Sequence, residues 1–84
     1  MTRIVWDLPD DVLLTLKVSA EELGPILRMA ASVKMVELGR ISSGAAARLA
    51  GVPRVVFLSR LADYGVDSFS LTEKELRDEV RLFQ

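Results

Sequence analysis

Three glycines, Gly39, Gly51 and Gly65, each end a stretch of residues with helical apolar spacing. Glycine adopts the left-handed backbone conformation that commonly follows the last turn of a helix, so each position predicts a helix end. The chain is therefore expected to fold into several short helices.

Prolines and capping residues predict where these helices begin. We expect the main helix at 25–39, because Pro25 suits a first turn and would cost about 3 kcal/mol in a helix interior. The capping-box pattern at 19–22 then belongs to a preceding turn. Further helices are expected at 44–50, capped by Ser42 or Ser43, at 53–64, and from a second capping box at 72–75 onwards.

Residues 3–8 alternate in polarity and are rich in β-branched and aromatic side chains, which predicts a short strand with Ile4 and Trp6 on one face. Pro9 and the two acids after it open a short helix. Residues 66–71 are a second candidate strand. Because one strand cannot pair its own backbone groups, residues 3–8 need a partner strand, from this chain or from a second copy.

Together these elements predict a single, mainly α domain over residues 1–84, with one or two short β-strands and a compact helical centre. Its parts are a strand and short helix (1–18), a helix (19–39), a helix-turn-helix (40–65), and a short strand and helix (66–84). Half of the residues are apolar, which is high for so small a chain. Self-association would cover the surplus, so a homodimer is expected.

Cysteine and histidine are both absent. Disulfides, thiolate and imidazole metal sites, and catalysis by imidazole are therefore excluded. The adjacent acids at 10–11 and 21–22 suit the positive ends of helices. We expect no enzyme, no catalytic residue, no metal and no cofactor. The sequence has no signal-peptide pattern and no apolar run that could span a bilayer, which favours a cytoplasmic protein that does not enter the membrane.

Charge is unevenly distributed along the chain. Residues 1–39 carry four basic and six acidic side chains, and residues 63–84 carry three and six. Residues 40–62 hold no acid and four basic side chains, which are Arg40, Arg48, Arg54 and Arg60. This block is either ordinary surface charge or the electrostatic footprint of a nucleic-acid site.

Residues 43–61 have the spacing of a helix-turn-helix. Small residues let two helices approach closely, a glycine allows the sharp turn, and large apolar residues anchor the second helix. The residues in these roles are Ala46, Ala47, Ala50, Gly51, Val52, Phe57 and Leu61. In DNA-binding proteins, such a joint places the second helix in the major groove while the first crosses the backbone. A helical pair in an unrelated core could show the same spacing.

The run from Glu37 to Arg54, followed by Phe57-Leu58, resembles a family of small uncharacterised prokaryotic proteins that are regarded as antitoxins of PIN-domain ribonuclease toxins. Its most specific part is Gly-Arg-Ile-Ser-x-Gly-x-Ala-Ala, beginning at Gly39. The resemblance extends to Leu-Pro-Asp-Asp-Val before residue 13 and to Tyr-Gly-Val at 64–66. It implies a DNA-binding autorepressor that also neutralises a toxin.

The chain departs from that family just after the turn, where Pro-Arg-Val-Val stands at 53–56. The second helix is therefore unusually apolar, whereas a helix that reads base edges normally presents polar side chains. The candidate DNA-binding residues are Arg40, Ser43, Arg48, Arg54, Ser59 and Arg60.

The apolar second helix leaves an alternative function open, a protein-interaction and dimerisation module that does not bind DNA. The acidic segment 67–84 either binds the toxin or closes the protein's own core. The candidate dimer or partner interface consists of Ile4, Trp6, Val55, Leu58, Leu76, Val80 and Phe83.

Overall fold

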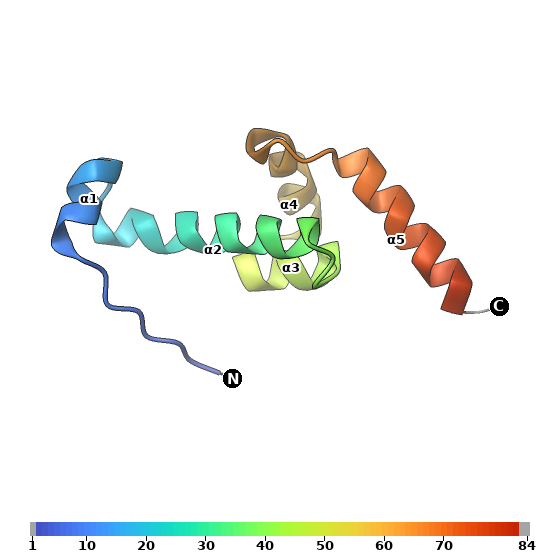
Figure 1. Cartoon of the computed structure of the whole chain (residues 1–84), viewed down its shortest axis with the longest axis horizontal. Coiled ribbons are helices and arrows are strands. Elements are labelled where there is room, and N and C mark those ends of the chain that lie inside the picture. The colour runs from blue at the N-terminus through green and yellow to red at the C-terminus, as the bar shows by residue number, and fades with distance from the viewer. Residues whose placement is uncertain (1, 83–84) are drawn as a thin grey trace.

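The computed structural model describes the backbone of residues 2–82 and the side chains of residues 2–77. Its elements are the helices α1 (Asp10–Leu16), α2 (Ala20–Glu37), α3 (Ser43–Ala50), α4 (Arg54–Arg60), the 3₁₀ turn η1 (Leu61–Tyr64) and α5 (Ser68–Leu82). The helices α3 and α4 pack around the C-terminal half of α2, while α1 and α5 lie at opposite ends of the molecule (Figure 1). The principal extents are 51 × 29 × 20 Å.

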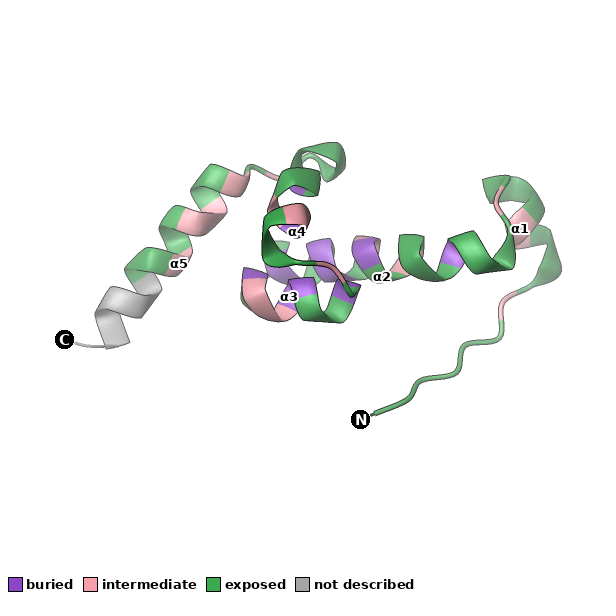
Figure 2. Cartoon of the chain, turned by 180° about the vertical axis from the view of Figure 1, so that it is seen from behind, coloured by how far each residue is buried: buried purple, intermediate pink, exposed green. Residues whose placement is uncertain are grey.

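One apolar cluster holds the central helices together (Figure 2). The helix α2 contributes a stripe at helical spacing, α3 contributes alanines, and α4 and η1 contribute large side chains. The buried members are Met29, Val33, Val36, Ala46, Ala47, Ala50, Phe57 and Leu61. Phe57 of α4 and Leu61 of η1 are fully buried, as expected of anchors. The helix expected at 53–64 is α-helical only over Arg54–Arg60 and continues as the 3₁₀ turn η1.

The turn between α3 and α4 has the connection expected of a helix-turn-helix. Gly51 has φ +78°, and its N–H donates to the carbonyls of Ala47 and Arg48, which ends α3. Pro53 then precedes the first residue of α4. The three alanines of α3 that face the core are buried, as expected of small residues where two helices cross.

The main helix begins earlier than expected. The helix α2 starts at Ala20, where the Ser19 hydroxyl accepts a hydrogen bond from Glu22 N–H at 3.2 Å, and Pro25 lies inside the helix. Proline removes only the hydrogen bond to the Glu21 carbonyl, and this part of α2 is exposed to water. The cap and the burial of Leu23 offset that loss.

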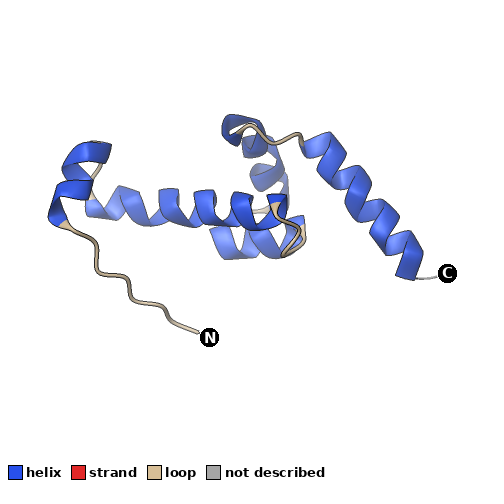
Figure 3. Ribbon diagram, viewed as in Figure 1, coloured by secondary structure: helices blue, strands red, loops and turns tan. Residues whose placement is uncertain are grey.

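The two predicted strands are wrong, because residues 2–82 contain no strand (Figure 3). Residues 2–9 are extended but have no second strand to pair with, and the side chains of Ile4 and Trp6 are 87% and 68% exposed. The segment 66–71 instead forms a two-residue connection and the first residues of α5.

The helix α5 begins before the capping box expected at 72–75. The Asp67 carboxylate accepts hydrogen bonds from Phe69 N–H at 2.9 Å and from the Ser70 hydroxyl at 3.0 Å, so Asp67 caps the helix. Thr72 lies within α5, where its hydroxyl donates to the Ser68 carbonyl at 2.8 Å. The bond from the Ser70 hydroxyl, followed by the backbone N–H bonds, lowers the pKa of Asp67 below 3.8.

Candidate nucleic-acid interface

The first residues of α3 and α4 meet at one corner of the helix-turn-helix. Arg54, the first residue of α4, donates from Nε to the Ser43 hydroxyl at 3.0 Å. Ser43, the first residue of α3, is only 1% exposed. Its neighbour Ser42 caps α3 by accepting a hydrogen bond from Ala45 N–H at 3.2 Å. The structure therefore brings together two of the predicted DNA-binding residues, Ser43 and Arg54.

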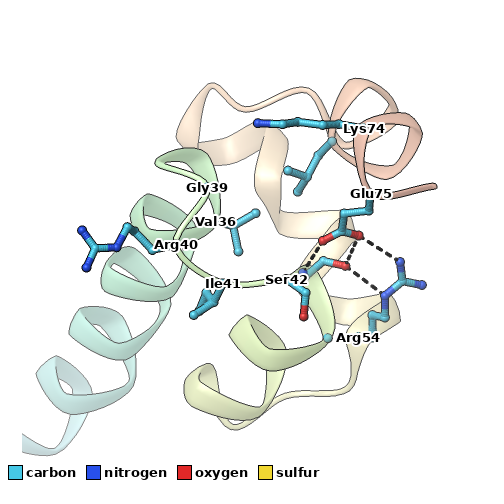
Figure 4. A pocket seen from close by; sticks show the side chains of 11 residues that line it. Val36, Gly39, Arg40, Ile41, Ser42, Arg54, Lys74 and Glu75 are labelled. Carbon is cyan, nitrogen blue, oxygen red and sulfur yellow. Dashed lines mark hydrogen bonds and ion pairs between the residues drawn. The ribbon is translucent and has the colours of Figure 1, made fainter. Parts of the chain in front are cut away.

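A carboxylate from α5 occupies this corner (Figure 4). The Ser43 N–H donates to Glu75 Oε1, and the Ser43 hydroxyl donates to Glu75 Oε2 at 2.8 Å. Arg54 Nη2 lies 3.6 Å from Glu75 Oε2. The buried serine thus has a partner for its N–H and for its hydroxyl, and one acid ties α5 to the starts of two other helices.

Two neighbouring residues of α5 meet helix ends of opposite polarity. Glu75 lies at the N-terminus of α3, where the helix dipole favours an anion. The Lys74 ammonium lies near Gly39, just beyond the C-terminus of α2, 3.9 Å from the point that a Cβ at that glycine would occupy. The charges of both side chains therefore favour the docked position of α5.

A groove of about 570 Å³ separates α5 from the α2–α3 connection and the starts of α3 and α4. Its apolar lining comes from Val36, Ile41 and Leu71. Its charged lining consists of three cations and one acid, which are Arg40, Arg54, Lys74 and Glu75. The groove is thus a predominantly basic site whose single described acid is bonded to Ser43 and Arg54.

The other predicted DNA-binding residues do not join this corner. Arg40 belongs to the α2–α3 connection, and its guanidinium points away from the groove (Figure 4). Arg48 on α3 and Arg60 at the end of α4 are both exposed. The Ser59 hydroxyl donates to the Val56 carbonyl at 2.7 Å, so α4 itself uses that donor.

The predicted interface residues fall into three groups. Ile4, Trp6, Val55 and Leu76 are exposed, with Val55 at 79% and Leu76 at 58%. Leu58 is half-buried and packs against the protein's own core. The side chains of Val80 and Phe83 lie outside the described residues.

Glu75 and Lys74 were not among the predicted site residues. The capping-box pattern at 72–75 marked Glu75 only as a local partner within its own helix. The structure pairs it with Ser43, which lies 32 positions away, and no local pattern encodes such a contact. A weak signal for such a contact exists. An acid stabilises the N-terminus of a nearby helix even when it belongs to another element.

Among residues whose side chains are described, no three potential metal ligands lie close enough to hold an ion. None of the helices in the described part of the chain combines the length and apolar content needed to cross a bilayer.

Comparison with known proteins relates the whole chain to one family. A family model matches residues 1–84, and the family is described as an uncharacterised protein family, UPF0175. We found no match among curated proteins and no match among solved structures.

Proposed function

The chain belongs to the uncharacterised protein family UPF0175, and we propose that it is an antitoxin of a type II toxin–antitoxin system, which binds duplex DNA as an autorepressor and neutralises a PIN-domain ribonuclease. The cytoplasm is the compartment in which both activities would operate. The resemblance of residues 37–58 to antitoxins motivates the proposal, and the geometry of the helix-turn-helix supports its DNA-binding part.

The observation that carries the proposal is the corner where α3 and α4 begin. DNA-binding helix-turn-helix proteins place the start of the second helix in the major groove and use helix N-termini to bind phosphates. Arg54 stands at that start, and Arg40, Arg48 and Arg60 are exposed on the α2–α3 connection, α3 and α4. Residues 40–62 hold no acid, so Arg40, Arg48 and Arg60 offer positive charge to an approaching phosphate, while Arg54 is paired with Glu75 of α5.

A homodimer is part of the proposal. The chain exposes 6878 Å² of surface, whereas a compact monomer of its mass would expose about 5,000 Å². The excess is larger than the roughly 800 Å² that each partner buries in an interface of standard size. The exposed apolar side chains of the N-terminal segment 2–8 are the first candidates for burial between two copies.

The helix α5 is the proposed toxin-binding element. Residues 63–84 carry six acids and three bases, which suits a partner whose RNA-binding face is basic. Leu71 packs against the protein's own core, whereas Leu76 is 58% exposed. The helix therefore contributes to the fold through Leu71 and Glu75 and leaves an apolar side chain exposed further along.

The toxin-binding claim is tested with the product of the neighbouring gene, which the proposal expects to be a PIN-domain ribonuclease. Cleavage of a labelled RNA should stop when the chain is added. Leu76→Asp should abolish the inhibition, while Leu14→Asp, which also charges an exposed leucine, should retain it. Full ribonuclease activity in an excess of the unmodified chain would contradict the claim.

The DNA-binding claim is tested by fluorescence anisotropy with a labelled duplex. Arg48→Ala should weaken binding to all sequences alike and reduce the salt dependence by about one ion, since it removes one phosphate contact. Lys17→Ala, which removes an exposed cation outside the basic block, should change neither quantity. Equal effects of the two substitutions would mean that the basic block is not the contact surface.

One observation favours a second candidate function, a dimerisation module that does not bind DNA. Val55 is 79% exposed on α4, at a position where a helix that reads bases would present a polar side chain. On this alternative, Val55 is buried against a second copy, and Val55→Asp dissociates the dimer. If α4 binds DNA instead, Val55→Asp weakens DNA binding and leaves the oligomeric state unchanged.

A further inference from the structure

We propose that Glu75 competes with DNA phosphate for Ser43 and Arg54, so that docking of α5 holds the helix-turn-helix in a form with low DNA affinity. This inference rests on the proposed DNA-binding function and adds a regulatory contact to it. The closed form is the one in which Glu75 is bonded to both residues.

The donors that hold Glu75 are the donors that a phosphate needs. A backbone N–H at the start of a helix, a hydroxyl and a guanidinium converge on the two carboxylate oxygens. Phosphate oxygens bind to the same combination of groups in protein–DNA complexes. One corner cannot bind both anions, because the Ser43 N–H and hydroxyl each carry a single proton to donate.

The position of α5 makes this competition possible. The buried core residues belong to α2, α3, α4 and η1, and α5 adds to them only the half-buried Leu71. The groove of about 570 Å³ lies between α5 and the rest of the site, so the helix is not packed along its length. Movement of α5 can therefore expose the corner without opening the core.

The charges around the groove support the same inference. Glu75 is the one acid in the described lining, and the base paired with it is Arg54, which stays on α4 when α5 moves. With Glu75 in place, a carboxylate occupies the position beside Arg54 and the α3 N-terminus that would favour a phosphate. Once α5 moves away with Glu75, the Arg54 guanidinium and the N-terminus of α3 remain to attract an anion.

The test compares two substitutions that remove the same charge from the same helix. Glu75→Ala removes the competitor, and Glu73→Ala removes an exposed acid two positions away. Binding to a labelled random-sequence duplex is measured for the full chain at fixed salt. If the closed form accounts for about nine-tenths of the molecules, Glu75→Ala should bind about tenfold more tightly. Glu73→Ala should bind no more than about twofold more tightly, through net charge alone.

Folding is checked by circular dichroism and thermal melting of each variant. Glu75→Gln supplies a second test, because it keeps the shape of the side chain and removes only the charge. Its affinity should also exceed that of Glu73→Ala. If Glu75→Ala loses its cooperative melting, the DNA affinity of Glu75→Gln is compared with that of Glu73→Ala instead.

Equal gains from the substitutions at Glu75 and Glu73 would overturn the inference and leave DNA binding intact, because Glu75 would then act only through net charge. Weaker binding by folded Glu75 variants would also overturn it, since the docked α5 would then support the DNA-competent form. If the unmodified chain and all three variants fail to bind duplex at low salt, the proposed DNA-binding function fails, and the inference fails with it.

Discussion

Ser43 has more partners than an ordinary first-turn serine. Its hydroxyl donates to Glu75 and accepts from Arg54, while its N–H donates to the same carboxylate. A buried hydroxyl without partners would destabilise the fold by about 1–3 kcal/mol. The side chain at this position therefore stabilises the docked position of α5, and on the proposal above it would bind a DNA phosphate only after α5 has moved away.

Two glycines, Gly44 within α3 and Gly51 in the turn after it, differ in backbone conformation and should respond differently to substitution. Gly51 has φ +78°, which an alanine adopts only with strain, although its Cβ would meet Arg28 Nη1 at an ordinary 3.6 Å. Gly51→Ala should destabilise the protein by about 1–2 kcal/mol. Gly44 lies within α3 at an ordinary φ, so Gly44→Ala should stabilise it by about 0.5–1 kcal/mol.

Urea denaturation of both variants checks these values. The changes in the free energy of unfolding should have opposite signs, although both substitutions add the same methyl group. If both variants are destabilised alike, conformational strain at Gly51 is not the cause of the effect.

Among the elements, local rules located the helix ends better than the helix starts. The left-handed glycines 39, 51 and 65 lie where expected, and Ser42 caps α3 as one of the two candidates considered. The start of α2 differs from the expectation because the Ser19 cap and the burial of Leu23 offset the cost of Pro25 inside the helix. The start of α5 differs because Asp67, which lies in the segment expected to be a strand, caps the helix.

Local sequence patterns also predicted part of the candidate site. Ser43 and Arg54 occupy defined positions in a local motif, so the sequence indicated both. Glu75 reaches them from an element that folds back from elsewhere in the chain, and its partner depends on the packing of Leu71 against the core. Tertiary placement of α5, which no short pattern encodes, decided that contact.

The cap of α5 gives a prediction that depends on pH. Hydrogen bonds from Ser70 and Phe69 lower the pKa of Asp67 below its usual 3.8, so the ionised form is the one that caps the helix. The stabilisation is present above pH 3.8 and is lost as the pH falls through the lowered pKa.

Amide resonances of Phe69 and Ser70 should therefore titrate with a midpoint below pH 3.8. Asp67→Asn keeps a capping oxygen but has no charge to lose, so its amides should not show this transition. A midpoint at or above 3.8 in the unmodified protein would contradict the assigned cap.

The whole molecule exposes more apolar surface than a small monomer normally does. Trp6 is 68% exposed on the extended segment before α1, and Ile4 is 87% exposed. If this segment is buried between two copies, sedimentation at micromolar concentration should show a dimer. Trp6→Asp should shift the equilibrium to monomer, because burial of an unpaired carboxylate in the interface is costly.

Asp7→Ala is a suitable control, since it changes an exposed polar residue in the same segment. It should leave the dimer intact. If the unmodified protein sediments as a stable, folded monomer, the predicted dimer is wrong.

The most direct test of the central claim, that the helix-turn-helix binds duplex DNA, is a salt titration of binding to DNA from the region upstream of the protein's own gene, with random duplex for comparison. A dimer presents two basic blocks, and roughly four to six phosphate contacts would give a slope of about −4 to −5 in log affinity against log salt. We expect that slope and tighter binding to the upstream DNA. Equal, feeble binding to both duplexes with no salt dependence would contradict the claim.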